Sequence, residues 1–395
     1  PVEDTQQPIV VGEEGMVYSE VVILEPKVAP PVILDQTPGI ELDADLVAES
    51  VGVLNIKSVY DIEGAATADL TTLADPAVKA VSMPDDDLVD LDGTAFGRSQ
   101  AQLMREILGY APIEPDGSVA VKVPANVAFW PEILDADGRR IGPRHQNWLH
   151  LRPGEVLTCN GCHTPASEVA HGRLDAEPPS ANPGAPVDGS PFPNTDPALF
   201  ANQGETMAEV YARINGYRTP SVDVLYDDVW TDTAVRAPDV SFAYQYSALS
   251  TTPPVDPGCV SNYNATCRIV VNYEDHIHPI WGLPRTDAMA VDRTCTSCHG
   301  EMDGMLVERR VPVLDGNGDP VFETDANGDL ILDPDGNPIP VTQPVGVQPP
   351  LSVAGANASL RFFSRFAAGG SHEGWLTPDE LRLISEWIDI GGQYY

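Results

Sequence analysis

The chain has 395 residues, of which 59 are Asp or Glu and 22 are Lys or Arg, so its formal net charge is −37. This acidic excess argues against binding to nucleic acid or anionic membranes and favours a basic partner, divalent cations or a salty medium, although it also serves solubility alone. With 42% hydrophobic residues the chain can build cores, and none of its apolar runs reaches the ~20 residues of a membrane span.

Proline and glycine account for 38 and 33 residues, nearly a fifth of the chain, which predicts an α+β fold with much irregular structure. Residue 1 is proline and not an initiator methionine, so we expect a mature or trimmed form. Residues 1–48 are acidic and rich in proline, and their strand-like runs have no clear core face. We therefore predict an extended N-terminal arm.

Residues 49–172 are predicted to form an α+β domain. The segments "VGVLNIKSVYD" and "GSVAVKVPANVAF" alternate apolar and polar residues, as half-buried strands do. Between them, "RSQAQLMREILGY" places Leu103, Ile107 and Leu108 at helical spacing, which predicts a helix.

The pattern C-x-x-C-H occurs twice, as Cys159, Cys162 and His163 and again as Cys295, Cys298 and His299. This pattern attaches c-type haem: the thiols add to the two vinyl groups, and the histidine becomes an iron ligand. A zinc ribbon places its cysteine pairs about 15–20 residues apart, whereas these pairs are more than a hundred residues apart, and a thioredoxin dithiol needs no histidine. Two covalent haems, and hence a periplasmic, extracellular or cell-surface location, are predicted.

Residues 173–258 are dense in Pro, Gly, Asn and Asp and read as a linker or wrapping loop, with a short helix at "ETMAEVYARI". The last region, 259–395, is predicted to be a domain that carries the second haem. At its start, Cys259 and Cys267 are close enough in sequence to form a disulfide in an oxidising compartment; two buried thiols are the alternative.

Each haem iron has a sixth position, and the chain has six further histidines: His145, His150, His171, His276, His278 and His372. We predict two bis-histidine haems. His372 lies among glycines just before a well-capped helix and is the candidate for the second haem. For the first haem the candidates are His276 and His278, with His145 and His150 as alternatives.

The relative direction of the two histidine side chains in "EDHIHPIW" depends on the backbone conformation of this segment. In an extended segment His276 and His278 point to the same face, whereas in a helix they diverge. Pro279 disfavours helix at the residue before it, so we expect an extended or turn conformation.

Residues 311–342 repeat an apolar run and an Asp/Asn/Gly turn, which predicts a β-hairpin insertion. Calcium is the functional alternative, although none of the loops completes an EF-hand. Its ligands would be Asp315, Asn317, Asp319, Asp325, Asn327 and Asp329. In "LTPDELRLISEWIDIGG", Thr377 and Glu380 predict a capping box, and Gly391 ends the helix.

Several long phrases, among them "REILGYAPIEPDGSVAVKVPANVAF", "RHQNWLHLRPGEVLTCNGCHTP", "CRIVVNYEDHIHPIW" and "HEGWLTPDELRLISEWIDIGGQYY", resemble the C-terminal part of the hydrazine synthase alpha-subunit-like multihaem c-type cytochromes, from about residue 51 to the end. The resemblance implies a middle domain with the first haem and a cytochrome c-like domain with a bis-histidine haem, which maps onto His299 and His372. It also implies that a β-propeller precedes this region in the family, so we expect a C-terminal portion here.

Two functions follow. The leading prediction is a dihaem cytochrome that transfers electrons between proteins outside the cytoplasm, with other redox proteins or copies of itself as partners, as a homo-oligomer or subunit of a larger complex. The alternative is a haem enzyme with one open iron that acts on a small nitrogen or oxygen compound. In the hydrazine-forming family members a tyrosine closely follows the first motif histidine, whereas "HTPASEVAHG" supplies none, so we predict no catalytic residues.

Overall fold

The computed structural model describes most of the chain from Gln36 onward. The described residues are 36–66, 77–82, 105–142, 147–164, 167, 176–188, 190–287, 289–299, 309–316, 318–325, 328–332, 336–345, 351–352 and 354–393. Contacts between Cα atoms divide the chain into residues 1–37 and 38–395, and the features below belong to the second unit. Most of the predicted arm lies outside the described residues.

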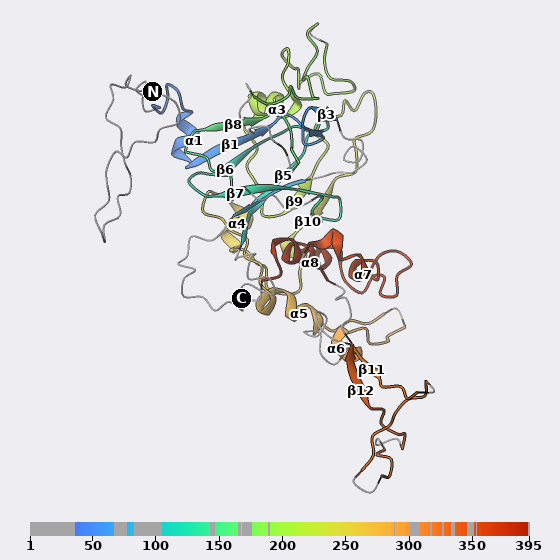
Figure 1. Ribbon diagram of the computed structural model, residues 1–395. Helices are drawn as coiled ribbons and strands as arrows, with labels where there is room; N and C mark the ends of the chain where they lie inside the picture. The colour runs from blue at the N-terminus through green and yellow to red at the C-terminus, as the bar shows by residue number, and fades with distance from the viewer. Residues whose placement is uncertain are drawn as a thin grey trace, which may run out of the picture. The chain divides into compact units, whose positions relative to one another are not determined.

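Two small sheets form the N-terminal half of this unit (Figure 1). In the first, β1 (Val51–Ile56) lies between β6 (Val119–Pro124), which is antiparallel to it, and β8 (Val156–Cys159), which is parallel. In the second, β4 (Ala77–Ser82) pairs antiparallel with β5 (Glu106–Pro112) and β7 (Phe129–Leu134). The strands predicted around β1 and β6 are therefore present.

Strand β1 is buried at all six positions, although its sequence predicts one exposed face. Leu46 packs against Val51 and Val53 on the face with Asn55, and the Asn55 side chain donates to Glu209 at 3.0 Å. The loop before β8 lies against the other face: a Cβ added at Gly52 would lie 2.8 Å from Leu151 Cβ and 3.0 Å from the Glu155 carbonyl oxygen, so only glycine fits here. The first C-x-x-C-H motif therefore begins on β8, which pairs with this buried strand.

The helix predicted around Leu103–Leu108 is wrong where the structure describes it, because β5 is a strand. Ile107 and Tyr110 contribute to one core, and Leu108 and Ala111 to another, so β5 has apolar side chains on both faces. A strand buried on both faces has an almost continuous apolar sequence, which periodicity cannot distinguish from a buried helix. The pairing with β4, which lies far away in sequence, decides the conformation.

Short elements connect the sheets to the rest of the unit. Helix α1 (Ala44–Ala48) packs Leu46 against Val51 and Val53, so the last residues of the predicted arm are helical. The predicted helix α3 (Met207–Asn215) is present, with Thr206 and Glu209 forming its capping box. The remaining elements of this part are β2 (Asp61–Ile62), β3 (Ala65–Ala66), β9 (Val224–Tyr226), β10 (Phe242–Tyr244) and α4 (Pro257–Ser261).

The C-terminal region is helical apart from one hairpin. Its elements are α5 (His278–Trp281), α6 (Cys295–Cys298), β11 (Arg309–Pro312), β12 (Thr342–Val345), α7 (Leu360–Phe363) and α8 (Pro378–Ile390). The predicted capping box of Thr377 and Glu380 is present, and Gly391 follows the last residue of α8. Strands β11 and β12 pair antiparallel, so a hairpin spans the segment where one is predicted.

Both regions that carry a C-x-x-C-H motif contribute to one shared core. It contains Ile107 of β5, Trp130 of β7 and Val224 of β9 together with Leu383 and Trp387 of α8. The predicted boundaries between residues 49–172 and 259–395 are consequently not boundaries between separate cores, and Figure 1 shows α8 between the strands and helix α5.

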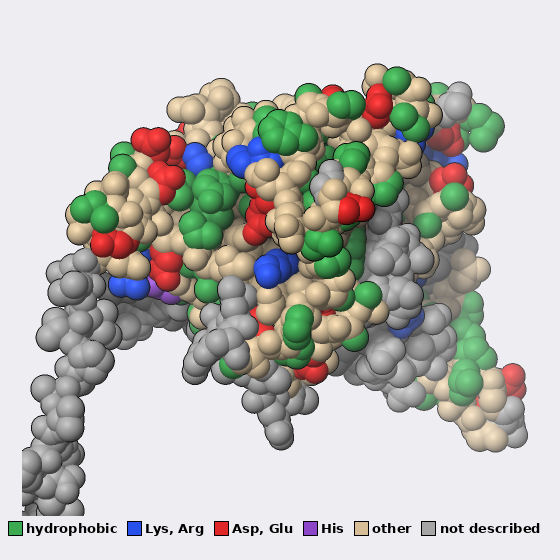
Figure 2. All heavy atoms as spheres, turned by 90° about the horizontal axis from the view of Figure 1, so that it is seen from above, with side chains coloured by type: hydrophobic (Ala, Val, Ile, Leu, Met, Phe, Trp, Pro, Cys, Tyr) green, Lys and Arg blue, Asp and Glu red, His purple; other side chains and the backbone are tan. Residues whose placement is uncertain are grey.

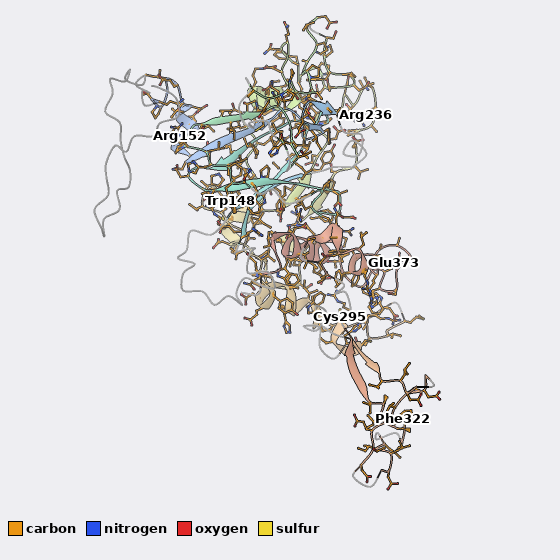
Figure 3. All side chains as sticks on the ribbon, viewed as in Figure 1. Trp148, Arg152, Arg236, Cys295, Phe322 and Glu373 are labelled. Carbon is orange, nitrogen blue, oxygen red and sulfur yellow. A yellow bond between two sulfur atoms is a disulfide. The ribbon has the colours of Figure 1, made fainter. Side chains whose placement is uncertain are left out.

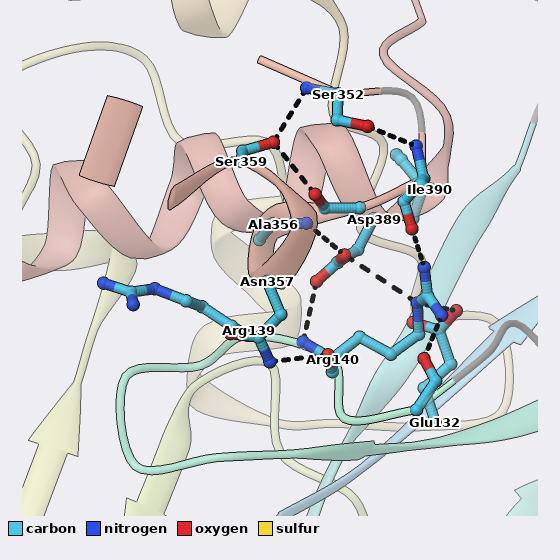
Figure 4. A network of polar contacts seen from close by, with 12 residues as sticks. Glu132, Arg139, Arg140, Ser352, Ala356, Asn357, Ser359, Asp389 and Ile390 are labelled. Carbon is cyan, nitrogen blue, oxygen red and sulfur yellow. Dashed lines mark hydrogen bonds and ion pairs between the residues drawn. The ribbon is translucent and has the colours of Figure 1, made fainter. Parts of the chain in front are cut away.

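A buried ionic network joins α8 to the second sheet (Figure 4). The Arg140 backbone N–H donates to Asp389 Oδ2 at 2.9 Å, and the Ala356 N–H donates to Oδ1 at 2.9 Å. The Arg140 guanidinium lies 3.5 Å from Glu132 Oε1, and its side chain is 5% exposed. Gly355 has φ of 125°, and a Cβ there would lie 2.6 Å from Arg140 Nη2. These contacts fix the C-terminal end of α8 against β7.

A second polar cluster lies inside the same interface. The hydroxyls of Tyr110 and Tyr246 donate to the two oxygens of Glu386, at 2.5 and 2.9 Å. Arg382 Nε donates to Glu386 at 2.6 Å, and its guanidinium lies 4.4 Å from the centre of the Tyr246 ring. Helix α8 thus buries charged residues as well as its apolar stripe, a feature that its sequence does not predict.

The surface of this unit mixes charge types. On the face seen in Figure 2, acidic and basic side chains are interspersed with exposed hydrophobic ones. Among the described residues, no helix has both the length and the apolar character that crossing a membrane requires.

Candidate haem-binding sites

The first C-x-x-C-H motif is held by the strand that precedes it. Cys159 is the last residue of β8 and pairs with Ile56 of β1. The Lys57 N–H donates to the Cys159 carbonyl at 2.9 Å, and the Cys162 N–H donates to the Asp61 carbonyl at 2.7 Å. Both ends of the cysteine pair are thereby bound to the chain that leaves β1.

The glycine within this motif has a steric role. A Cβ at Gly161 would lie 2.8 Å from the Asp61 carbonyl oxygen and 2.7 Å from its Cγ. Real Cβ atoms do not approach backbone that closely, so the motif can lie against Asp61 only with glycine at this position. The equivalent residue of the second motif is Ser297.

The cysteines of the first motif are not bonded to each other. Burial, together with the charge of Glu177, raises the pKa of the Cys159 thiol to about 11. Burial, with smaller effects of Cys159 and Asp61, raises the pKa of the Cys162 thiol to about 12. Both thiols are therefore neutral at physiological pH.

His163 is partly buried, and its Nδ1 lies 3.2 Å from the Thr164 carbonyl oxygen. A carbonyl accepts only from a protonated nitrogen, so this contact places the proton on Nδ1 and makes Nε2 the unprotonated nitrogen, the form in which histidine ligates metals. The Thr164 hydroxyl and N–H donate to Glu63, which anchors the residue after the motif. The side chains of the first motif thus fit a haem with His163 as a ligand.

The second motif forms a short helix, α6. Cys295 is buried and Cys298 is exposed, and the His299 N–H donates to the Cys295 carbonyl at 3.0 Å. Burial raises the pKa of the Cys295 thiol, and the nearby Arg285 opposes this rise. Arg285 in turn makes two hydrogen bonds to Glu380, at 2.7 and 3.0 Å, which ties the approach to this motif to the first turn of α8.

His299 and His372 face each other across 6.4 Å between ring centres, with ring planes inclined by 27°. A metal–imidazole bond is about 2 Å, and the ring centre lies roughly 1 Å beyond the bonding nitrogen, so two imidazoles on opposite sides of one metal have centres about 6 Å apart. The separation therefore suits two axial ligands of one iron. Figure 3 marks Cys295, the first cysteine of this motif.

The surroundings of His372 favour a neutral imidazole. Its Nδ1 lies 2.7 Å from the Ser371 hydroxyl oxygen, and its ring centre lies 4.3 Å from that of Trp375 and 5.6 Å from that of Phe366. Burial lowers the pKa of His372, and the charge of Arg365 lowers it further. When Nδ1–H donates to the Ser371 hydroxyl, Nε2 is the unprotonated nitrogen, which is the form that iron binds.

The extended conformation expected for the histidine pair is wrong. Residues Tyr273–Ile277 form a π-helix that runs directly into α5, and His278 has φ of −54° and ψ of −43°. Pro279 lies in the first turn of α5, where its missing N–H leaves no hydrogen bond unmade, and the helix therefore tolerates it. As a result His276 is buried and His278 is exposed.

The hydrogen bond made by the His276 ring also argues against this histidine as an iron ligand. His276 Nδ1 accepts the Asn272 N–H at 3.2 Å, and burial lowers the pKa of this histidine. A neutral ring whose Nδ1 accepts carries its proton on Nε2, so His276 presents no free lone pair in this conformation. His278 is the better candidate of the pair.

The other candidate ligands are less defined. His150 is exposed, while His145 and His171 lie outside the described residues. Within the described part of the chain, His299 and His372 are the histidines whose rings face each other. The sixth ligand of the first haem remains a prediction.

Two of the predicted calcium ligands accept hydrogen bonds within turns of the chain. Asp315 Oδ1 accepts the Asp319 N–H at 3.1 Å, and Asp325 Oδ1 accepts the Asp329 N–H at 3.0 Å. Asn317 and Asn327 are outside the described residues, and those that are described contain no group of three or more His, Cys, Asp or Glu placed to hold a metal. Turn formation accounts for Asp315 and Asp325 without calcium.

The predicted disulfide between Cys259 and Cys267 is present, with 5.7 Å between the Cα atoms. Sequence reasoning missed Arg285, Glu380 and Ser371 as neighbours of the second motif. Ser371 could have been found because it adjoins His372, whereas no local signal links Arg285 to Glu380, which is 95 positions away.

Comparison with known proteins agrees with the motifs. The family model described as the hydrazine synthase alpha subunit middle domain matches residues 65–164, which include the whole first motif. Hydrazine synthase subunit alpha of Kuenenia stuttgartiensis is 35% identical over 71 residues, which are 18% of this chain and 8% of that protein. The solved Kuenenia stuttgartiensis hydrazine synthase matches 87% of this chain and 43% of that chain, with 17% identity and a TM-score of 0.40. The chain spans well under two thirds of these relatives, and the match over residues 65–164 confirms, for this segment, the predicted resemblance to the hydrazine synthase alpha subunit middle domain.

Proposed function

We propose that the protein is a dihaem c-type cytochrome that transfers electrons outside the cytoplasm. The observation that carries the proposal is the 6.4 Å separation of the His299 and His372 rings beside Cys295 and Cys298. A haem bound there supplies a one-electron iron couple. If His299 and His372 both bound this iron, no position on it would be left for a substrate, which suits a carrier.

The chain's own residues support this role. Phe366 and Trp375 flank His372, and the Arg285–Glu380 ion pair holds the approach to Cys295 at the start of α8. Such packing fixes the ligands in one geometry, and a fixed geometry keeps the reorganisation that accompanies electron transfer small. The disulfide between Cys259 and Cys267 fits the same oxidising compartment that covalent haem attachment requires.

A second candidate function concerns the first motif. The hydrazine synthase alpha family model covers Cys159, Cys162 and His163, so an open first haem that acts on a small nitrogen or oxygen compound is the alternative. The relative is a subunit of hydrazine synthase, and this likeness also favours a place for the present chain in a larger complex.

Absorption spectra of the holoprotein, with and without carbon monoxide, test both. If the protein is a carrier, both haems are low spin and the ferrous spectrum does not change with carbon monoxide. If the first haem is open, about half of the haem responds. His372→Ala should convert one haem to a high-spin form that binds carbon monoxide, and Glu373→Ala, at the exposed neighbour of His372, serves as the control.

Two low-spin haems that are unchanged in His372→Ala would show that His372 is not a ligand and remove the basis of the proposal. The ratio of haem to protein should be unchanged in both variants, because the thioether bonds do not involve His372.

A further inference from the structure

The hairpin insertion has no core of its own. We call residues 313–341 the acidic extension. Each described residue from Leu314 to Leu332 is exposed. Six of them are large and apolar, with exposed fractions of 36–56%: Leu314, Val321, Phe322, Leu330, Ile331 and Leu332. Figure 3 shows the Phe322 side chain in this segment.

The backbone of the acidic extension is nonetheless ordered by hydrogen bonds. The Val313 N–H donates to the Val341 carbonyl, and the Val321 N–H donates to the Val313 carbonyl, both at 2.8 Å. The Ile331 N–H donates to the Glu323 carbonyl at 2.9 Å. A stack of short hairpins therefore displays apolar side chains that nothing described in this chain covers. Contiguous exposed apolar side chains usually mark an interaction site.

Charge selects the kind of partner. Residues 313–341 contain seven acidic residues and no Lys, Arg or His. A second copy of the chain would bring another extension of the same charge on a protein of net charge −37. Like charges at an interface oppose binding, whereas a basic surface gains attraction and faster association. Five of the acidic residues are described and exposed in the same segment as the apolar side chains: Asp315, Asp319, Glu323, Asp325 and Asp329.

The acidic extension also begins close to the second haem motif. Strand β11 starts at Arg309, ten residues after His299, so the base of the extension is at most about 35 Å of extended chain from that histidine. A protein bound at the extension is thereby kept near the haem predicted at His299 and His372.

We propose that the acidic extension is a docking arm for a basic redox protein, which binds it through an apolar patch with a basic rim and exchanges electrons with the second haem. The inference rests on the proposed electron-transfer function and names the class of partner for it. The apolar side chains provide the contact area, and the carboxylates speed association and select for basic proteins.

The test uses the full holoprotein and a small basic cytochrome c as the probe. The variant Phe322→Ser, Leu330→Ser, Leu332→Ser removes apolar area without changing charge. The control Ile40→Ser, Val187→Ser, Val240→Ser removes three apolar side chains that are 78–85% exposed elsewhere. A third variant replaces residues 313–341 with a short Gly-Ser linker. Affinity is measured at low and at physiological ionic strength.

We expect the probe to bind the wild type and the control equally, and to bind the triple variant and the linker variant at least tenfold more weakly. A succinylated probe, whose lysines have become acidic, should not bind. Equal affinity of the wild type and the triple variant overturns the docking arm. Self-association, or binding to phosphatidylcholine vesicles, that only the triple variant loses also overturns it, because the occupant is then a second copy or a membrane.

The absorption spectra separate this inference from the proposed function. If the haems are low spin and the affinities are unchanged, only the docking arm fails. If no bis-histidine haem is present, the electron-transfer proposal fails whatever the probe does.

Discussion

At the residue scale, single contacts decide which candidate side chains can serve a haem. The Asn272 N–H occupies Nδ1 of His276, while the Ser371 hydroxyl contacts Nδ1 of His372. Residue spacing does not predict these contacts, because they depend on which neighbouring group lies next to which ring nitrogen. The cysteine pairs and the motif histidines, in contrast, are recognised from sequence because the porphyrin itself dictates their spacing.

Replacing the two histidines of "EDHIHPIW" separately tests the assignment within that pair. His278→Ala should convert the first haem to high spin, because His278 is exposed, whereas the Asn272 N–H occupies Nδ1 of the buried His276. His276→Ala should leave both haems low spin and lower the free energy of unfolding by about 1–3 kcal/mol, because a buried backbone N–H loses its acceptor. Magnetic circular dichroism of the ferric protein measures the spin states, and a high-spin haem in His276→Ala alone would reverse the assignment.

The close contact between Gly161 and Asp61 gives a prediction for haem attachment. Gly161→Ala should reduce the fraction of chains that carry the first haem, because a Cβ would lie 2.8 Å from the Asp61 carbonyl oxygen and displace the motif from β1. Ser297→Ala changes the equivalent position of the second motif and is the control. Mass spectrometry of the purified protein counts the haems, and full occupancy in Gly161→Ala would show that the motif tolerates the displacement.

At the element scale, the sequence predicts the ends and the apolar stripe of α8 well, but it does not predict which residues surround the helix. Its cap residues and apolar stripe follow local rules, so Thr377 and Gly391 mark its ends correctly. Its buried polar residues depend on partners more than a hundred positions away, such as Tyr110 for Glu386 and Arg140 for Asp389. The conformation of β5 also depends on a tertiary contact. Its apolar sequence is compatible with a helix, and its pairing with β4 selects the strand.

The cluster around Glu386 predicts an alkaline loss of stability. Burial and the neighbouring Glu386 hold the pKa of Tyr246 well above its ordinary value. A tyrosine in the unfolded chain loses its proton near pH 10, whereas Tyr246 in the folded protein keeps it. The free energy of unfolding therefore falls as pH rises through about 10, and the contribution of Tyr246 to it is constant below that pH. Tyr246→Phe should lower the free energy of unfolding by about 1–3 kcal/mol at pH 8 and weaken its decline above pH 10.

Urea unfolding at pH 8 and pH 10.5 measures both effects. Tyr226→Phe, in strand β9 and only partly buried, is a suitable control. An equal decline between the two pH values in wild type and Tyr246→Phe would mean that Tyr246 ionises normally in the folded protein.

At the scale of the whole molecule, the shared core makes the two haem-bearing regions one cooperative unit. Residues of β5, β7 and α8 pack together, and the Arg140–Asp389 pair is buried between them. We expect urea to unfold residues 38–395 in one transition, with the same midpoint for tryptophan fluorescence and for haem absorption. Two separate midpoints would show that the regions fold independently, as the sequence boundaries suggest.

The sequence by itself predicted two haem motifs and determined the disulfide, the capped C-terminal helix and the resemblance to the hydrazine synthase alpha subunit middle domain. Each of these depends on residues close together in the chain, where spacing is a direct physical constraint. Only the tertiary structure decided that β5 is a strand, that His276 and His278 diverge, and that His372 faces His299. Those outcomes depend on strand pairing and burial between distant segments, whose free energies outweigh the local preferences that the sequence displays.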